Sequence, residues 1–320
     1  MNTNTLTRIA TITAIIAGVS LLIAGVIGAA SGAFRAIAAG GFRFNEAVRA
    51  GCVAVDERKS LPIAGINHIV VNAVSENITI REGSGESVMA WFHGNVSSAD
   101  RPHLQVNQRG DTAEIRIERP HHIHMAFGSM YNDAVLEVGI PQQYVGDLSA
   151  ESVSADVTLG SHDYAELALT TTSGDIEAGA MKAGSLTLRT TSGDVRVRGL
   201  ATERAEIYSV SGDIHVTAFT GDVEAHSISG GVARSPTKTP GSIAVETVSG
   251  DIRLGMPPSA EFTLDAHSTS GGVTCGFPIT VTNSHAGGEH SLAGAVGSGK
   301  GAVTVRTVSG DITITREGGK

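Results

Sequence analysis

The feature that most constrains the fold of this chain is a short phrase, T-x-S-G-D-[IV], that returns at a nearly fixed spacing. Its serines lie at steps of 19, 19, 19, 18, 20, 21 and 39 residues, at Ser154, Ser173, Ser192, Ser211, Ser229, Ser249, Ser270 and Ser309. A period of this length is typical of a stack in which each repeat forms one turn of a β-solenoid. The 39-residue step indicates a coil that has lost its marker.

Residues at fixed offsets from each marker share one chemistry. Apolar residues recur six and four positions before it and three and five positions after it, and Ser or Thr stands two positions before it. The column three positions after the marker is β-branched throughout: Val157, Ile176, Val195, Ile214, Val232, Ile252, Val273 and Ile312. Alternation at period two predicts two short strands per coil that share an inner face. Arg234 is the one charged residue in these columns.

The corner phrase itself has two chemical interpretations, a turn or a ladder of cation ligands. Glycine suits a backbone position with positive φ, and Asp or Ser side chains close corners by accepting from nearby N–H groups. Two copies, at 229–231 and 270–272, replace the Asp by Gly, which a turn tolerates and a ligand ladder does not. The pattern of calcium-binding solenoids, with several Asp and Gly per nonapeptide, is absent. The phrase therefore predicts a turn.

Composition excludes some functions. The chain of 320 residues has a formal net charge of −9 and only 4% aromatic residues, without the basic surface that nucleic-acid binding needs. Its two cysteines, Cys52 and Cys275, do not make a disulfide framework, and whether they pair is left open. Cys275 falls in an inward column, which favours a buried apolar role.

The N-terminal region carries a second strong signal, a stretch of 26 residues without charge from Ile9 to Phe34. This length suffices for a helix that spans a membrane and exceeds the apolar part of most signal peptides, although cleavage remains open. The predicted organisation is a tail at 1–8, a transmembrane helix or signal anchor at 9–34, a linker at 35–60, an irregular β section at 61–145 that begins with a diverged first coil, and regular β-solenoid repeats at 146–317.

Two local features outside the repeat raise the question of a site. His121, His122 and His124 lie together, but no carboxylate or cysteine stands at a ligand-like spacing beside them, so a polar loop is favoured over a metal site. The Gly-rich range 278–302 lacks the spacing of a phosphate-binding loop. It is interpreted as a loop insertion on a corner, where repeat proteins often place a binding surface. No catalytic, cofactor-binding or metal-binding residue is assigned.

The tandem T-x-S-G-D-[IV] corners resemble those of a bacterial family of putative adhesins, a domain of unknown function. The segment SGGVTCGFPITV with the closing TVSGDITI is similar to the C-terminal end of that family, and the resemblance covers about 61–317. It implies a β-solenoid, often tethered to a membrane, and an association with the cell surface or with envelope stress. Arg8 before the apolar stretch and three arginines after it favour a cytoplasmic body. Long domains cross largely regardless of charge, so the resemblance decides for an extracytoplasmic one.

These observations predict an all-β, single-domain β-solenoid of about 19–21-residue coils, held at the cell membrane by a single pass. Its expected function is that of an adhesin-like, non-catalytic binding or structural module whose partner is an envelope protein, a glycan or a lipid. An envelope-stress sensing or regulatory component is the alternative. A polysaccharide-active enzyme is disfavoured, because the exposed column of Glu177, Arg196, His215 and Arg253 mixes signs without an acid–base pair.

Overall fold

The computed structural model describes residues 52–97, 101–119, 133–238, 241–281, 287–288 and 290–317. Within these ranges the chain is all-β and contains no helix, which confirms the all-β part of the predicted fold class. None of the described residues forms a helix of the length and apolarity required to cross a membrane. The predicted transmembrane helix at 9–34 and the cluster of His121, His122 and His124 lie outside the described residues.

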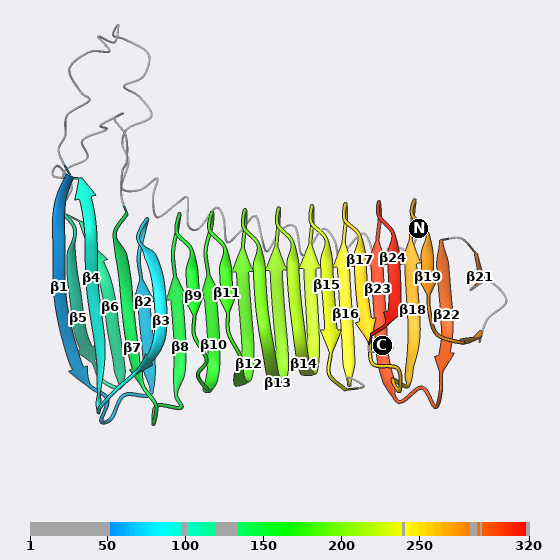
Figure 1. The fold of residues 1–320 in the computed structure, drawn as a ribbon, viewed down its shortest axis with the longest axis horizontal. Helices are drawn as coiled ribbons and strands as arrows, with labels where there is room; N and C mark the ends of the chain where they lie inside the picture. Colours follow the sequence, from blue (N-terminus) through cyan, green and yellow to red (C-terminus); the bar gives the residue numbers. More distant parts are fainter. Residues whose placement is uncertain are drawn as a thin grey trace, which may run out of the picture.

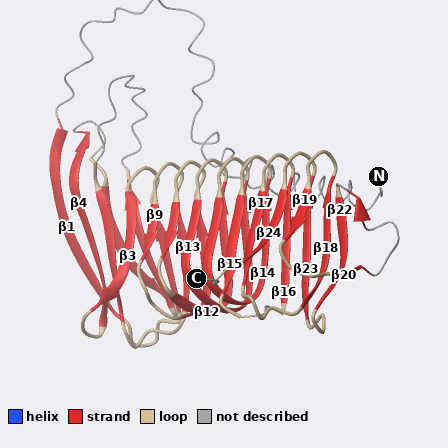
Figure 2. Cartoon of the chain, turned by 45° about the vertical axis from the view of Figure 1, so that its right-hand side comes forward, coloured by secondary structure: helices blue, strands red, loops and turns tan. Residues whose placement is uncertain are grey.

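The strands form two faces that are joined at narrow corners along one edge of an elongated stack (Figures 1 and 2). Face A precedes the corners and contains, in spatial order, β5 (His103–Arg109), β6 (Thr112–Glu118), β2 (His68–Asn72), β8 (Asp147–Glu151), β10 (Tyr164–Thr170), β12 (Met181–Thr190), the second halves of β13 (Val195–Ser209) and β14 (Ile214–Ser227), β16 (Ser242–Thr247), β23 (Gly301–Thr307), β18 (Phe262–Ser268) and β22 (Ser291–Val296).

Face B follows the corners. It contains β1 (Cys52–Pro62), β4 (Ser87–Ser97), β7 (Val135–Pro141), β3 (Asn77–Gly83), β9 (Val157–Leu159), β11 (Ile176–Ala178), the first halves of β13 and β14, β15 (Val232–Pro236), β17 (Ile252–Met256), β24 (Ile312–Arg316) and β19 (Val273–Cys275). Two short strands, β20 (Thr280–Val281) and β21 (Gly287–Gly288), pair with β22.

The register of the parallel strands matches the sequence columns. Ile176 pairs with Val157 on one side and with Val195 on the other, and Leu188 pairs with Leu169 and Ile207. The inward columns are buried through the middle of the stack, so both faces contribute side chains to one continuous core. The prediction of two strands per coil that share an inner face is confirmed.

The N-terminal end of the stack differs from the prediction in two ways. The coil of β2 and β3 is not the first in space, because it lies between the coil of β6 and β7 and the coil of β8 and β9. The range 35–60 is also not entirely a linker, since β1 starts at Cys52 and pairs antiparallel with β4 over its whole length. Its mixed polar sequence resembles a linker because β1 is an edge strand, and charged side chains are common on such edges.

The C-terminal end also corrects the sequence analysis. The final coil of β23 and β24 inserts between the coil of β16 and β17 and the coil of β18 and β19. Residues within the 39-residue step form β22, which pairs antiparallel with the outer side of β18. The described residues within 278–302 therefore include an end strand with the short strands β20 and β21 paired to it, and this arrangement is neither a coil without a marker nor a loop insertion on a corner. An open stack exposes its last apolar layer, and β22 covers the face A side of that layer.

Candidate functional site

The corner glycines have a different role from the predicted one. None of Gly174, Gly193, Gly212, Gly230, Gly250, Gly271 and Gly310 has a positive φ. A Cβ on any of them would instead stand far less than 3.0 Å from the carbonyl oxygen of the equivalent residue in the neighbouring coil. At these seven corners the coils approach so closely that no side chain fits between them. Positive φ occurs at Gly199 and Gly221, where β13 and β14 cross the opposite edge.

Two sets of side chains tie each corner to the next. Five members of the buried Ser/Thr column donate to the carbonyl oxygens of corner glycines, as from Thr190 to Gly174 at 3.2 Å and from Ser209 to Gly193 at 3.3 Å. Each corner aspartate accepts the backbone N–H of the next corner. Those distances run from 2.7 to 3.0 Å, with acceptors Asp156, Asp175, Asp194, Asp213, Asp251 and Asp311. The corner phrase is therefore a structural connection along the stack.

Arginines relieve the repulsion between stacked carboxylates. Arg196 contacts Asp194 at 2.5 Å and Asp175 at 3.3 Å, and Arg253 contacts Asp251 at 2.8 Å. The N–H of Asp311 and the charge of Arg253 hold the pKa of Asp251 below its usual range. A carboxylate with a lowered pKa stabilises the fold at neutral pH, and that contribution is lost as the pH falls through the lowered value. No group of three His, Cys, Asp or Glu in the described ranges is arranged to hold a metal ion.

The outer side of face A carries a network of polar side chains that contact one another. His226 is buried, its ring stacks on Tyr208 at 5.1 Å between centroids, and its Nε2 lies 2.9 Å from Glu224 Oε1. Arg204 contacts both Glu206 and Glu224. The members of this network come from neighbouring coils whose strands pair in register. Their contacts therefore stabilise the packing of one coil against the next.

Arg234 breaks the apolar interior, as its column position indicates. Its side chain is only 1% exposed, and it stacks between Val216 and Leu254. One guanidinium nitrogen, Nη1, donates to the carbonyl of Val223 at 3.1 Å, whereas Nε and Nη2 have no hydrogen-bond partner among the described residues. Burial lowers the pKa of Arg234 to about 9, against the opposing effect of the charge on Glu224. A charged group with two unused donors is costly in this place.

We expect the substitution Arg234→Leu to stabilise the protein. Leucine matches the neighbours in its column, and replacing a poorly compensated buried charge by an apolar residue often gains about 1 to 4 kcal/mol. The control is Arg253→Leu in the next coil. The side chain of Arg253 is 66% exposed, so its replacement should change the free energy of unfolding by no more than about 0.5 kcal/mol. Thermal unfolding followed by circular dichroism would measure both. A lower melting temperature for Arg234→Leu would show that the guanidinium is compensated.

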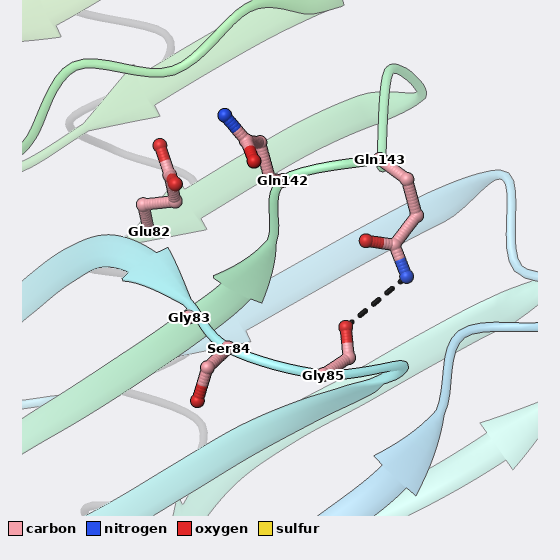
Figure 3. A pocket seen from close by; sticks show the side chains of 6 residues that line it. All are labelled: Glu82, Gly83, Ser84, Gly85, Gln142 and Gln143. Atoms are coloured by element: carbon pink, nitrogen blue, oxygen red, sulfur yellow. Dashed lines mark hydrogen bonds between the residues drawn. The ribbon is translucent and has the colours of Figure 1, made fainter.

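A polar pocket opens on the edge opposite the corners, near the N-terminal end of the stack. It has a volume of about 380 Å³ and is lined by Glu82, Gly83, Ser84, Gly85, Gln142 and Gln143. Glu82 and Gly83 end β3, Ser84 and Gly85 lie in the turn between β3 and β4, and the glutamines belong to the turn after β7. Gln143 Nε2 donates to the carbonyl of Gly85 at 3.1 Å and fixes the two turns together (Figure 3). The carboxylate of Glu82, the hydroxyl of Ser84 and the carboxamide of Gln142 line the remaining wall (Figure 3).

Sequence reasoning did not find this pocket. Its two turns lie about sixty residues apart and carry no motif, and they meet only because β3 and β7 pair in parallel. The exposed column that was predicted on face B is present, since Glu177, Arg196 and His215 are in register on β11, β13 and β14. Of these, Arg196 serves the corner aspartates.

The fold defines a class, a two-faced β-solenoid closed at its corners by stacked Ser-Gly-Asp turns. A family model described as Toastrack DUF4097 matches residues 66–315, and the chain belongs to this family. A comparison with curated proteins finds no match. A solved structure of a putative adhesin from Bacteroides fragilis is 15% identical, with a TM-score of 0.50, and the match covers 81% of this chain and 97% of that one.

A second solved structure, of a putative adhesin from Parabacteroides distasonis, is 12% identical with a TM-score of 0.45, and the match covers 81% of this chain and 97% of that one. At such identities the likeness concerns the fold alone. The predicted membership of a family with tandem Ser-Gly-Asp corners and a domain of unknown function is confirmed by the family match.

Proposed function

We propose that the chain is a non-catalytic binding module of the bacterial envelope, held at the membrane by residues 9–34 with its solenoid outside the cytoplasm. The proposal rests on a contrast between the polar groups that bond to one another within the stack and those that line the pocket. Those at the corners and on face A bind one another between coils, so they build the stack. The pocket between Glu82 and Gln142 is different, because its polar wall faces open space.

Of the partners considered from the sequence, a glycan suits this pocket best. Its wall offers a carboxylate, a hydroxyl, carboxamides and backbone groups, and its lining residues include no large apolar side chain. Such groups recognise hydroxyl-bearing ligands through directed hydrogen bonds. Gly83 and Gly85 add no side-chain bulk to the lining of the pocket. The bond from Gln143 to Gly85 holds the turns in place before a ligand arrives.

The general test is retention of the purified full chain on cell-wall material, membrane vesicles and envelope proteins of the producing cell. We expect retention on the glycan-containing fractions. Retention on none of these fractions would overturn the proposal. The orientation has its own test, protease treatment of intact cells that carry a tag after Lys320. Loss of the tag is expected for an external solenoid, whereas a protected tag would place the solenoid in the cytoplasm.

We expect Glu82→Ala to weaken retention on the glycan fraction by at least about tenfold, because a hydrogen bond to a charged group contributes about 1.5 to 3 kcal/mol. Glu177→Ala is the matched control, since that glutamate is also exposed and lies on β11, away from the pocket. Titration of each variant against the immobilised fraction measures the effect. Equal affinities for the two variants would place the binding surface elsewhere.

A further inference from the structure

One coil in the interior of the stack contains three buried polar side chains that lack some of their hydrogen bonds. This coil, residues 223–236, is formed by the second half of β14 and by β15. It pairs with β13 and β14 on one side and with β16 and β17 on the other (Figure 1). Among the described residues, Nδ1 of His226, Oγ of Ser227, and Nε and Nη2 of Arg234 have no hydrogen-bond partner. Unused buried groups cost stability, so this coil is a place where the stack can open at a reduced cost.

His226 is the member of this set whose residue type changes its charge near neutral pH. Its side chain lies on the outer side of face A and is only 7% exposed, because three strands supply its neighbours. Tyr208 on β13 stacks against the ring, Nε2 lies 2.9 Å from Glu224 Oε1 on β14, and Nδ1 lies 3.6 Å from Glu246 Oε2 on β16. His226 and Glu246 are paired in register, so the contact at Nδ1 spans the joint between the 223–236 coil and the next one.

The other charged side chains around the ring have partners of their own. These groups are Arg204 with Glu206 and Glu224, Arg189 over the ring of Tyr208, Arg306 on β23 with Asp265, and Arg234 on the inner side with the carbonyl of Val223. The hydroxyl of Tyr208 donates to Glu206 at 3.3 Å. Glu246 forms no ion pair with an arginine or a lysine in the described part of the chain, so His226 is the basic group that can bind its carboxylate.

The two charge states of His226 differ in the bonds that they can form. A neutral imidazole has one N–H, and the shorter contact gives it to Nε2 and Glu224, so the lone pair of Nδ1 then faces the carboxylate of Glu246. A protonated ring donates through both nitrogens, one to each carboxylate, and such charge-assisted bonds are roughly twice as strong as neutral ones. The protonated ring therefore links β14 to β16, whereas the neutral ring does not.

We propose that His226 is a proton-dependent link that holds the 223–236 coil to the coil of β16 and β17. Uptake of a proton within the range of histidine, about pH 5 to 8, closes the link, and loss of that proton at higher pH releases it. Carboxylates take up protons near about pH 4, which removes the acceptors, so the link is strongest in weakly acidic surroundings. The link stands by itself, but its meaning as a response to the medium outside the cell rests on the proposed function.

Hydrogen exchange of the purified full chain tests the link at the joint itself, because protection of an amide measures the local opening equilibrium. The measurement is made at about pH 5.5 and about pH 8, toward the two ends of the histidine range. Protection factors, corrected for the intrinsic effect of pH on exchange, should be about fivefold or more higher at the lower pH for the amides that join β14 to β16. The amides that join β10 to β12 should show no such gain, because neither strand contains a histidine.

Two variants separate this link from general effects of pH. Glu246→Gln should abolish the gain in protection, because a carboxamide can donate to the unprotonated Nδ1 and close the joint at high pH as well. His215→Gln is the matched control and should keep the gain, since His215 lies on the same strand but is 45% exposed on face B. Equal protection of the joint at both pH values, or a gain that persists in Glu246→Gln or disappears in His215→Gln, would overturn the proposal. None of these results would change glycan retention or its dependence on Glu82.

Discussion

Gly230→Ala is expected to destabilise the protein by about 3 kcal/mol or more, which is at the upper end for overpacking a closely packed site. The added methyl group would overlap the carbonyl oxygen of Gly212 in the neighbouring coil. Neither partner can move away, because both belong to the backbone of corners that are bonded on both sides. Thermal unfolding should show a decrease of roughly 6 to 12 °C for a chain of this size.

The adjacent glycine provides the matched control. A Cβ at Gly231 would lie 3.5 Å from Asp213 Oδ1 and 3.5 Å from the carbonyl of Asp251, which are ordinary contacts. Gly231→Ala should therefore leave the melting temperature within a few degrees of that of the unchanged protein. If both substitutions had equal effects, the loss would come from backbone flexibility, and the close approach of the coils would not be the reason for glycine at the corner.

Glu76→Ala is expected to cost about 3 to 5 kcal/mol, the usual consequence of removing one partner from a buried ion pair. Glu76 is fully buried at the corner of the coil of β2 and β3, in the position that glycine holds in later corners. Its carboxylate accepts from the backbone N–H groups of Val74 and Ser75 and from Arg119. Without it, these donors lose an acceptor in a place with little access to water.

Chemical denaturation of Glu76→Ala and of the neighbouring control Glu118→Ala would measure this effect. Glu118 is exposed at the end of β6, so its replacement should change the free energy of unfolding by no more than about 0.5 kcal/mol. The double variant Glu76→Ala with Arg119→Met should recover part of the loss, because it also removes the uncompensated cation. A loss for Glu76→Ala as small as that of the control would mean that the pair contributes little.

The corner phrase illustrates how far sequence reasoning reaches. Its spacing predicted the coil, and its two Gly-for-Asp exchanges favoured a turn, which is where the structure places the phrase. The assignment of positive φ to the corner glycines was wrong, because a phrase of three residues does not reveal how close the next coil lies. Gly193 and Gly174 are neighbours only in the stack, and the contact between them decides why glycine is needed.

The order of coils at the two ends could not be predicted for a related reason. Periodicity indicates which residues face inward, but an insertion of β2 and β3 between later coils leaves that pattern unchanged. The 39-residue step was therefore interpreted as a lost corner, whereas the structure uses those residues for the end strand β22. The pocket beside Gln142 and Gln143 depends on the same pairing of distant strands.

The sequence by itself determined the all-β class, the length of the coil, the inward columns and the charged residue Arg234 within them. These features follow from the local alternation of apolar residues and from a pattern that recurs in each coil. Only the tertiary structure decided the neighbours of each coil, the tie from each aspartate to the next corner and the pocket. Those features depend on which backbone groups meet across the stack. Hydrogen bonds and close contacts between coils select these neighbours, and no single repeat contains that information.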